Sequence, residues 1–145
     1  MIARILLITL LYAATISSAY SAPLTLSFNG LSNDHSKLVV QIYASKASWL
    51  DDDPQQMALF SLIDPAQLSA NGSIEVELEF GDYAIYAYQD LDDNGELNSN
   101  WIGIPTEPVG TSNAAKGFMG PPKYDDAKFI FTKDHQQIQL TLVEI

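Results

Sequence analysis

Ile74-Glu75-Val76-Glu77-Leu78-Glu79-Phe80 alternates apolar and acidic side chains without a break. Successive side chains of a β-strand point to opposite faces of the sheet, so this stretch predicts a strand with one dry face and one wet face. Strands of this kind are typical of antiparallel sheets that expose one face to water. The stretch therefore predicts an all-β, antiparallel fold.

The same two-residue period recurs along the chain. It predicts further strands over residues 24–29, 38–44, 83–88, 127–132 and 137–142. About seven short strands in one small domain favour a Greek-key β-sandwich. Residues 46–71 are less regular, but Asp53-Pro54 has the form of an N-cap followed by a proline at the first helical position, which predicts one short helix near 54–60.

The N-terminal segment, residues 1–21, has the pattern of a signal peptide. Arg4 precedes an apolar run from Ile5 to Ile16, and small residues follow it, which predicts cleavage after Ala19 or Ser21. The run is shorter than the roughly 20 residues that span a bilayer. We therefore expect a cleaved signal, a single β-sandwich domain over residues 22–145, and no transmembrane segment after cleavage.

Composition excludes several classes of protein. The 145 residues include 18 Asp and Glu against 7 Lys and Arg, a formal net charge of −11. Nucleic-acid binding needs a basic surface, so no nucleic-acid partner is expected. The chain has no cysteine, which rules out disulfides, thiolate metal sites and a thiol nucleophile. Its hydrophobic fraction of 47% is too high for a disordered acidic tail.

The segment 90–100 carries oxygen-bearing side chains at alternating positions, which is the pattern of a calcium-binding loop. Gly95 stands at position six, where such a loop turns sharply. Trp101 stands at position twelve, where a bidentate glutamate normally completes the shell. We therefore predict a weak site, or one that borrows a carboxylate from Glu107 or residues 51–53. The candidate metal ligands are Asp90, Asp92, Asn94, Glu96 and Asn98.

A second interpretation of this segment is a solvated hairpin turn. Asn94-Gly95 is a strong signal for a two-residue type I′ turn. The residues after it, 96–100, lack the alternation expected of a returning strand. Both interpretations stay open from the sequence, and calcium is the cofactor that the first one predicts.

Residues 99–123 form a long, irregular stretch that is rich in glycine and proline and has few runs that could form a strand. Connections of this length are often functional. Trp101, Glu107, Phe118 and Met119 are candidates for a ligand-binding surface. The alternative is that the large apolar side chains pack beneath the loop as a small satellite core.

Several motifs along the chain are specific when taken in order. They are Gly81-x-Tyr83-Ala84-Ile85, Asp90-x-Asp92-x-Asn94-Gly95-x-Leu97, Gly103-Ile104-Pro105-x-Glu107, Ser112-Asn113 and Gly120-Pro121-Pro122-x-Tyr124-x-Asp126-Ala127-x-Phe129. Together they resemble a bacterial secreted family catalogued as domain of unknown function 2141, over essentially the whole mature chain.

The resemblance implies export from a Gram-negative cell and a transthyretin-like or immunoglobulin-like sandwich, and it brings no established activity. This chain departs from the family pattern at two places. Ala114 follows Ser112-Asn113 where members often continue with a second asparagine, and Asn98 stands where they often have a carboxylate. The second departure argues against tight calcium binding.

No set of residues predicts catalysis. Asp34-His35-Ser36 contains the residue types of a triad, but adjacent side chains on an extended chain point apart. His135 lies in a second polar turn. We therefore assign no catalytic residue and predict a periplasmic or secreted, non-enzymatic binding or interaction module with a protein, glycan or small-molecule partner. A carrier or accessory protein for a small ligand or lipid in the cell envelope is the alternative, and a hydrolase is the second alternative.

Overall fold

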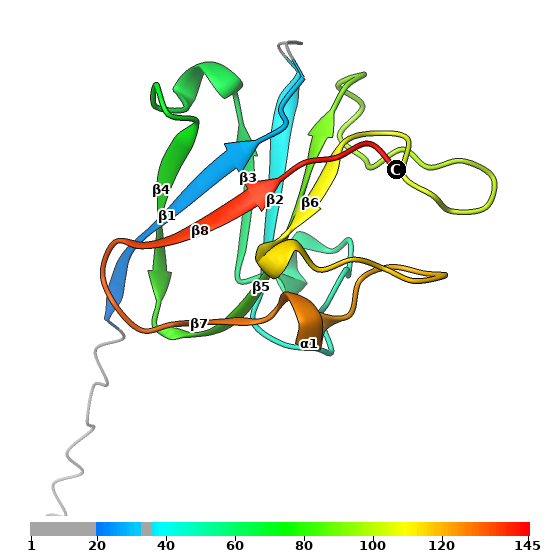
Figure 1. The fold of residues 1–145 in the computed structure, drawn as a ribbon. Coiled ribbons are helices and arrows are strands. Elements are labelled where there is room, and N and C mark those ends of the chain that lie inside the picture. The colour runs from blue at the N-terminus through cyan, green and yellow to red at the C-terminus, as the bar shows by residue number, and fades with distance from the viewer. Residues whose placement is uncertain (1–19, 33–35) are drawn as a thin grey trace, which may run out of the picture.

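Two β-sheets make up the structure, a computed structural model that describes residues 20–32 and 36–145 (Figure 1). The first sheet has three strands in the order β4-β1-β8. The second has five, β3-β2-β5-β6 with β7 also paired to β5. The strands are β1 (Ser21–Asn29), β2 (Lys37–Tyr43), β3 (Leu59–Ile63), β4 (Ser73–Glu79), β5 (Gly81–Asp90), β6 (Val109–Thr111), β7 (Phe129–Phe131) and β8 (Gln136–Thr141). This architecture confirms the predicted all-β sandwich.

Five of the six strand pairings are antiparallel, as predicted, and the pairing of β1 with β8 is parallel. In β1, Leu26 lies opposite Ile74 on one side and Ile138 on the other. The inward-facing residues of β1 alternate with half-exposed ones, which is the burial pattern that a two-residue period predicts.

The main core lies between the two sheets and draws on both of them. Its fully buried members come from the first sheet (Leu24, Leu26, Leu140) and from the second (Leu38, Val40, Ile42, Ile85, Phe131). Burying one such side chain stabilises the fold by about 1.5–3 kcal/mol. A chain without disulfides therefore relies on this shared layer.

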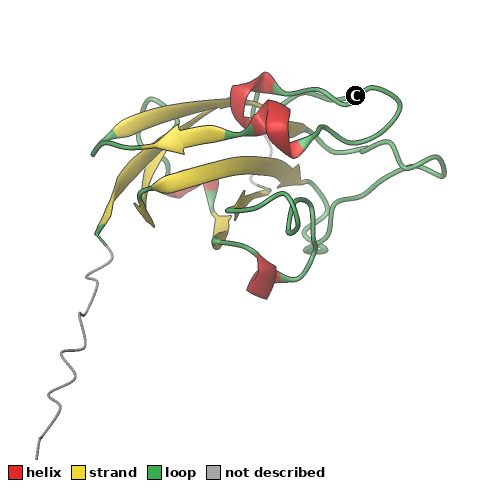
Figure 2. Cartoon of the chain, turned by 90° about the horizontal axis from the view of Figure 1, so that it is seen from below, coloured by secondary structure: helices red, strands yellow, loops and turns green. Residues whose placement is uncertain are grey.

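One expectation was wrong for the second sheet. The alternation of β2 and β5 predicted a wet outer face, but Val39 and Tyr43 on that face of β2 are fully buried. The segments that follow the strands cover this face and form a second apolar cluster with it. The Trp49 ring lies 5.2 Å from that of Tyr43 and 5.9 Å from that of Tyr124. Figure 2 shows these loops and short helices around the strands, with the loops in green and the helices in red.

Two strands lie where the sequence predicted none. β3 falls in the segment 46–71, and β6 falls inside the stretch 99–123. β6 is buried at all three residues. Gly110 in β6 packs so closely on β8 that a Cβ atom would lie 2.7 Å from the carbonyl oxygen of Thr141. The long loop is therefore two separate loops on either side of a buried strand.

The helical structure of the described residues is limited to four short elements. They are the 3-10 helices η1 (Pro54–Gln56), η2 (Pro65–Gln67) and η3 (Ser112–Ala114) and the α-helix α1 (Tyr124–Ala127). The helix expected near 54–60 is the single turn η1, and the Asp53 side chain caps it by accepting a hydrogen bond from the Gln55 amide at 2.9 Å. No helix in the described part of the chain is long and apolar enough to cross a membrane.

Most of the predicted signal peptide, residues 1–19, lies outside the described residues. Ser21, one of the predicted cleavage positions, is the first residue of β1 and pairs with Glu79.

The Ser112-Asn113 motif, which directly follows β6, connects separate segments of the chain by hydrogen bonds. The Ser112 side chain, fully buried, accepts a hydrogen bond from the Ile85 amide at 2.9 Å and donates one to the Ala127 carbonyl at 2.6 Å. The side-chain amide of Asn113 donates a hydrogen bond to the Lys128 carbonyl at 2.7 Å. The motif thus joins the α1–β7 segment to the central strand β5, which is a structural role.

Ser112→Ala is expected to lower the free energy of unfolding by about 1–3 kcal/mol, because two buried backbone groups lose their partner while the side-chain volume hardly changes. Ser99→Ala, at an exposed position, is the matched control and is expected to change stability by less than about 0.5 kcal/mol. Urea unfolding of both variants measures the difference. Equal stabilities would show that the Ser112 hydroxyl does not join these segments.

Candidate functional site

The acidic segment lies in the loop between β5 and β6, drawn in yellow-green in Figure 1. β5 ends at Asp90, and the strand that pairs with it, β6, begins only at Val109. Gly95 has a positive φ of 83°, but Asn94 does not, and a type I′ turn needs both. The hairpin-turn interpretation is therefore wrong, since the chain runs through a long loop before it returns.

Asp90, at the end of β5, organises the first half of the loop. Its side chain is 1% exposed. One carboxylate oxygen accepts a hydrogen bond from the Asn94 amide at 3.2 Å, and the other accepts from the Gly95 amide at 2.8 Å. A buried carboxylate must be hydrogen-bonded to offset the loss of water. The chain is therefore wrapped around Asp90.

Glu107 organises the second half. It was predicted as part of an exposed ligand surface or as a carboxylate lent to the loop, and the structure buries it at 3% exposure. Its Oε1 accepts a hydrogen bond from the Leu91 amide at 2.7 Å, and its Oε2 accepts from the Asn98 amide at 2.9 Å. Glu107 thus bridges the two ends of the acidic segment and does not lie on the surface.

Three carboxylates meet at this point. Asp90, Asp92 and Glu107 each offer an oxygen atom, and these atoms lie within 4.8 Å of one another. Calcium binds oxygen ligands at about 2.3–2.6 Å, so two ligands of one ion are at most about 5 Å apart. Each carboxylate oxygen has two lone pairs and can accept a hydrogen bond while facing a cation. The cluster has dimensions that suit a calcium ion.

The two candidate asparagines lie beside the same cluster. The Asn98 amide nitrogen donates to Asp92 Oδ2 at 2.8 Å, and that of Asn94 donates to the same oxygen at 3.2 Å. These amide donors partly offset the negative charge of Asp92. Rotation of an amide by half a turn would present oxygen in place of nitrogen, so both side chains could serve as cation ligands.

Glu96 is the candidate ligand that the structure does not bring into the carboxylate group. Its side chain is exposed, and its backbone amide donates to Asn94 Oδ1 at 2.8 Å. The next residue, Leu97, is half-buried against the second apolar cluster, as expected for the position that anchors such a loop. Of the two predicted sources of an additional carboxylate, Glu107 joins the group and residues 51–53 do not.

A tyrosine of β5, Tyr88, lies beneath the acidic loop. The Tyr88 hydroxyl lies 3.5 Å from the Gly95 carbonyl oxygen. Burial, with smaller contributions from Asp90 and Glu107, raises the pKa of Tyr88 to about 12. Burial raises the pKa of Tyr86 on the same face to about 12 as well. Both phenols therefore stay neutral well above the usual pKa of tyrosine.

These two tyrosines predict a loss of stability at alkaline pH. A raised pKa in the folded state stabilises it fully below about pH 10, and the contribution disappears as the pH rises from about 10 to about 12. The ultraviolet absorbance of tyrosinate should show a late-titrating class in the native protein that is absent in denaturant. Titration of every tyrosine near pH 10 before unfolding would contradict this prediction.

Glu107→Gln tests the bridge without any metal. An amide nitrogen in place of one carboxylate oxygen faces a backbone N–H, so one hydrogen bond is lost and a donor opposes a donor. We expect a loss of about 1–3 kcal/mol in unfolding free energy in the presence of a chelator. Glu96→Gln, the same change at an exposed position of the loop, is expected to be close to neutral. A neutral Glu107→Gln in urea unfolding would contradict the bridging role.

The remaining candidate surface residues lie at the ends of two loops. Trp101 is 94% exposed, Phe118 is 90% exposed and Met119 is 96% exposed. The alternative that they pack beneath the loop is therefore wrong. The tryptophan that does pack as a satellite core is Trp49, whose ring N–H donates to the Pro122 carbonyl at 2.8 Å.

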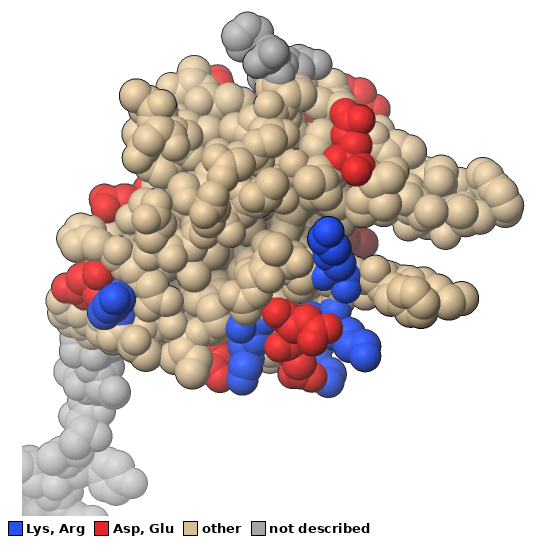
Figure 3. All heavy atoms as spheres, viewed as in Figure 1, with Lys and Arg blue, Asp and Glu red and all other residues tan. Residues whose placement is uncertain are grey.

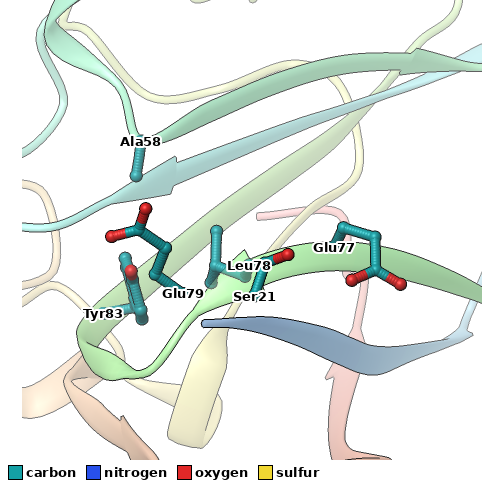
Figure 4. Close-up of a pocket in the computed structure, with 6 residues that line it drawn as sticks. All are labelled: Ser21, Ala58, Glu77, Leu78, Glu79 and Tyr83. Atoms are coloured by element: carbon teal, nitrogen blue, oxygen red, sulfur yellow. The ribbon is translucent and has the colours of Figure 1, made fainter. Parts of the chain in front are cut away.

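Two shallow pockets lie elsewhere on the described surface. One, of about 420 Å³, is lined by Ser21, Ala58, Glu77, Leu78, Glu79 and Tyr83. Figure 4 shows the Glu79 carboxylate lying toward Ala58 and Tyr83, and that of Glu77 turned away. His135 lies in neither pocket. Its ring pairs with Glu75 at 3.1 Å on the exposed surface, and His35 falls outside the described residues.

These features define a small β-sandwich with a buried carboxylate pair at the base of an acidic loop. The chain belongs to the family described as "Uncharacterized protein conserved in bacteria (DUF2141)", whose family model matches residues 26–139. The match covers most of the sandwich and the whole acidic loop, and it confirms the resemblance seen in the sequence motifs. Searches of the curated proteins and of the solved structures found no match.

Proposed function

We propose that this protein is an exported, non-enzymatic binding or interaction module whose 90–107 loop is completed by a calcium ion. The observation that carries the proposal is the meeting of the Asp90, Asp92 and Glu107 carboxylates within 4.8 Å. Carboxylates from two ends of one loop are brought to a single point by the fold. Oxygen donors in this arrangement are what a hard divalent cation prefers.

Electrostatics supports a cation at this point. Like charges at this separation repel one another, and a divalent ion between them removes the repulsion. The three ion pairs among the described residues lie elsewhere, at Lys46, Lys128 and His135. A cation would therefore supply positive charge to the loop, where the basic side chains of the described residues form no ion pair.

The same geometry indicates weak affinity. Both oxygens of Asp90 and of Glu107 already accept backbone hydrogen bonds, and Asn98 supplies a neutral ligand. Sites with few carboxylates bind calcium in the range of about 10⁻⁴–10⁻³ M, which suits extracellular modules. The signal-like N-terminal segment supports a location outside the cytoplasm, where such a site is of use.

The chemistry proposed for the ion is structural. Bound among Asp90, Asp92 and Glu107, it would fix the loop on which Trp101 is carried. No catalytic role is proposed for it, since no described pocket brings a nucleophile or base to the loop.

Calcium titration of the purified protein tests the proposal. For a dissociation constant near 1 mM, about 10 mM calcium stabilises the fold by about 1.4 kcal/mol, which raises Tm by about 3–6 °C. Isothermal titration calorimetry and thermal unfolding, each with a magnesium control, measure the effect. No heat and no change in Tm at millimolar calcium would contradict the proposal.

A matched pair of variants locates the site. Asp92→Asn removes a carboxylate from the cluster and is expected to weaken calcium binding at least about tenfold. Asp93→Asn removes the same charge from the neighbouring residue, which lies outside the cluster. Asp93 has a positive φ of 54°, and asparagine tolerates that conformation, so this control should bind like the wild type. Equal losses in both variants would indicate only nonspecific attraction to the acidic loop.

A further inference from the structure

Large apolar side chains are exposed to solvent at the ends of two loops. The first tip carries Trp101 and Ile102, which are 94% and 55% exposed, and the second carries Phe118 and Met119, which are 90% and 96% exposed. Both loops project from the same side of the molecule in Figures 1 and 2. Figure 3 shows them as two separate protrusions with a hollow between them.

Hydrogen bonds of the Asn100 backbone and side chain hold the first tip in shape. Asn100 Oδ1 accepts hydrogen bonds from the Ile102 amide at 3.1 Å and the Ile104 amide at 3.0 Å. The Asn100 amide donates to the Ile104 carbonyl at 2.8 Å, and the Gly103 amide donates to the Asn100 carbonyl at 2.9 Å. The turn closes without any packing by the indole of Trp101, so the fold gains nothing from that side chain.

The second tip carries its apolar residues at a position that a turn would normally give to glycine or asparagine. Met119 has a positive φ of 54°, which is unfavourable for a residue of this size. Gly117 packs against the backbone of Gly120 so closely that no Cβ would fit. The chain therefore accepts local strain while exposing Phe118 and Met119, and such sites tend to be functional.

Two lysines flank the second tip, in a chain whose net charge is −11. Lys116 and Lys123 bracket it in sequence, and both are exposed. Two other lysines near the loop are paired, Lys46 with Asp125 at 2.8 Å and Lys128 with Asp82 at 3.2 Å. Lys116 and Lys123 are in none of the ion pairs formed by the described residues. Figure 3 shows basic side chains at and below the base of this protrusion, with acidic side chains among them.

We propose that the two tips insert Trp101, Phe118 and Met119 into an anionic lipid surface. Apolar side chains on separate convex protrusions match a soft surface that yields around each of them, whereas a folded protein partner would need two matching pockets. Tryptophan favours the membrane–water interface, and lysines beside an apolar tip attract anionic headgroups. This inference gives the proposed binding module its partner, but it does not depend on calcium.

Vesicle binding of the purified mature protein tests the proposal. Vesicles of phosphatidylcholine with phosphatidylglycerol, and of phosphatidylcholine alone, are sedimented with the protein in EGTA and in millimolar calcium. We expect binding to the anionic vesicles in at least one of the two conditions, with a blue shift of tryptophan emission. Trp101→Phe should remove the shift, because the remaining Trp49 is packed against Tyr43.

Three double variants distinguish insertion of the apolar tips from electrostatic attraction to the vesicle surface. Trp101→Ser with Phe118→Ser removes apolar side chains that make no packing contribution, and it should reduce vesicle binding by about tenfold or more at unchanged Tm. Phe60→Ser and Leu62→Ser change apolar residues of similar type on the outer face of β3, 44% and 48% exposed, and should bind like the wild type. Lys116→Glu with Lys123→Glu should abolish the preference for phosphatidylglycerol.

The outcomes distinguish the two proposals. Absence of vesicle binding in both EGTA and calcium overturns the inference, whatever the calorimetric heat of calcium binding shows. Binding that survives the loss of Trp101 and Phe118 also overturns it, because attraction through charge alone would then account for the result. Binding in EGTA that depends on the tips supports it even if the loop binds no calcium.

Discussion

The two central strands of the five-stranded sheet are apolar on both faces, and the rest of the structure depends on this constraint. The three-stranded sheet covers one face of β2 and β5. The other face, with Val39, Tyr43 and Tyr86, must be kept from water by something else. In this chain the connecting segments do so. The loops therefore act as a third layer of the fold, and the burial of this apolar face determines where they lie.

The acidic loop shows how such a layer brings polar chemistry into contact with a core. Leu97 packs onto the second apolar cluster, which draws the residues on either side of it toward the sheet. Asp90 lies at the end of β5 and Glu107 just before β6, and both are buried. Each is stabilised by two backbone amides. Burial of carboxylates is costly without such donors. The loop conformation and the carboxylate cluster therefore depend on each other, since the backbone amides of the loop are the hydrogen-bond donors of both buried carboxylates.

Sequence periodicity predicted six of the eight described strands and missed β3 and β6. β3 is nearly continuous in apolar residues (Leu59-Phe60-Ser61-Leu62-Ile63), and β6 has only three residues, so neither shows a period. The spacing from Asp90 to Asn98 was sufficient to predict an acidic loop over residues 90–100. The burial of Glu107 was not predictable, because it arises when β6 pairs with β5 and brings Pro108 beside Gln89, whose amide donates to the Pro108 carbonyl at 3.0 Å.

The parallel pairing of β1 with β8 has a consequence for how the chain is made. Leu26 and Ile138 are partners in that ladder. β1, the first described strand to be synthesised, therefore cannot complete its pairing until β8, the last described strand, has been synthesised. Until β8 arrives, one edge of β1 exposes unpaired backbone groups, and such edges invite pairing with other chains. Contacts this distant in sequence also slow folding. Completion of the three-stranded sheet is therefore a late event, and a chain shortened at its C-terminus would retain an open edge.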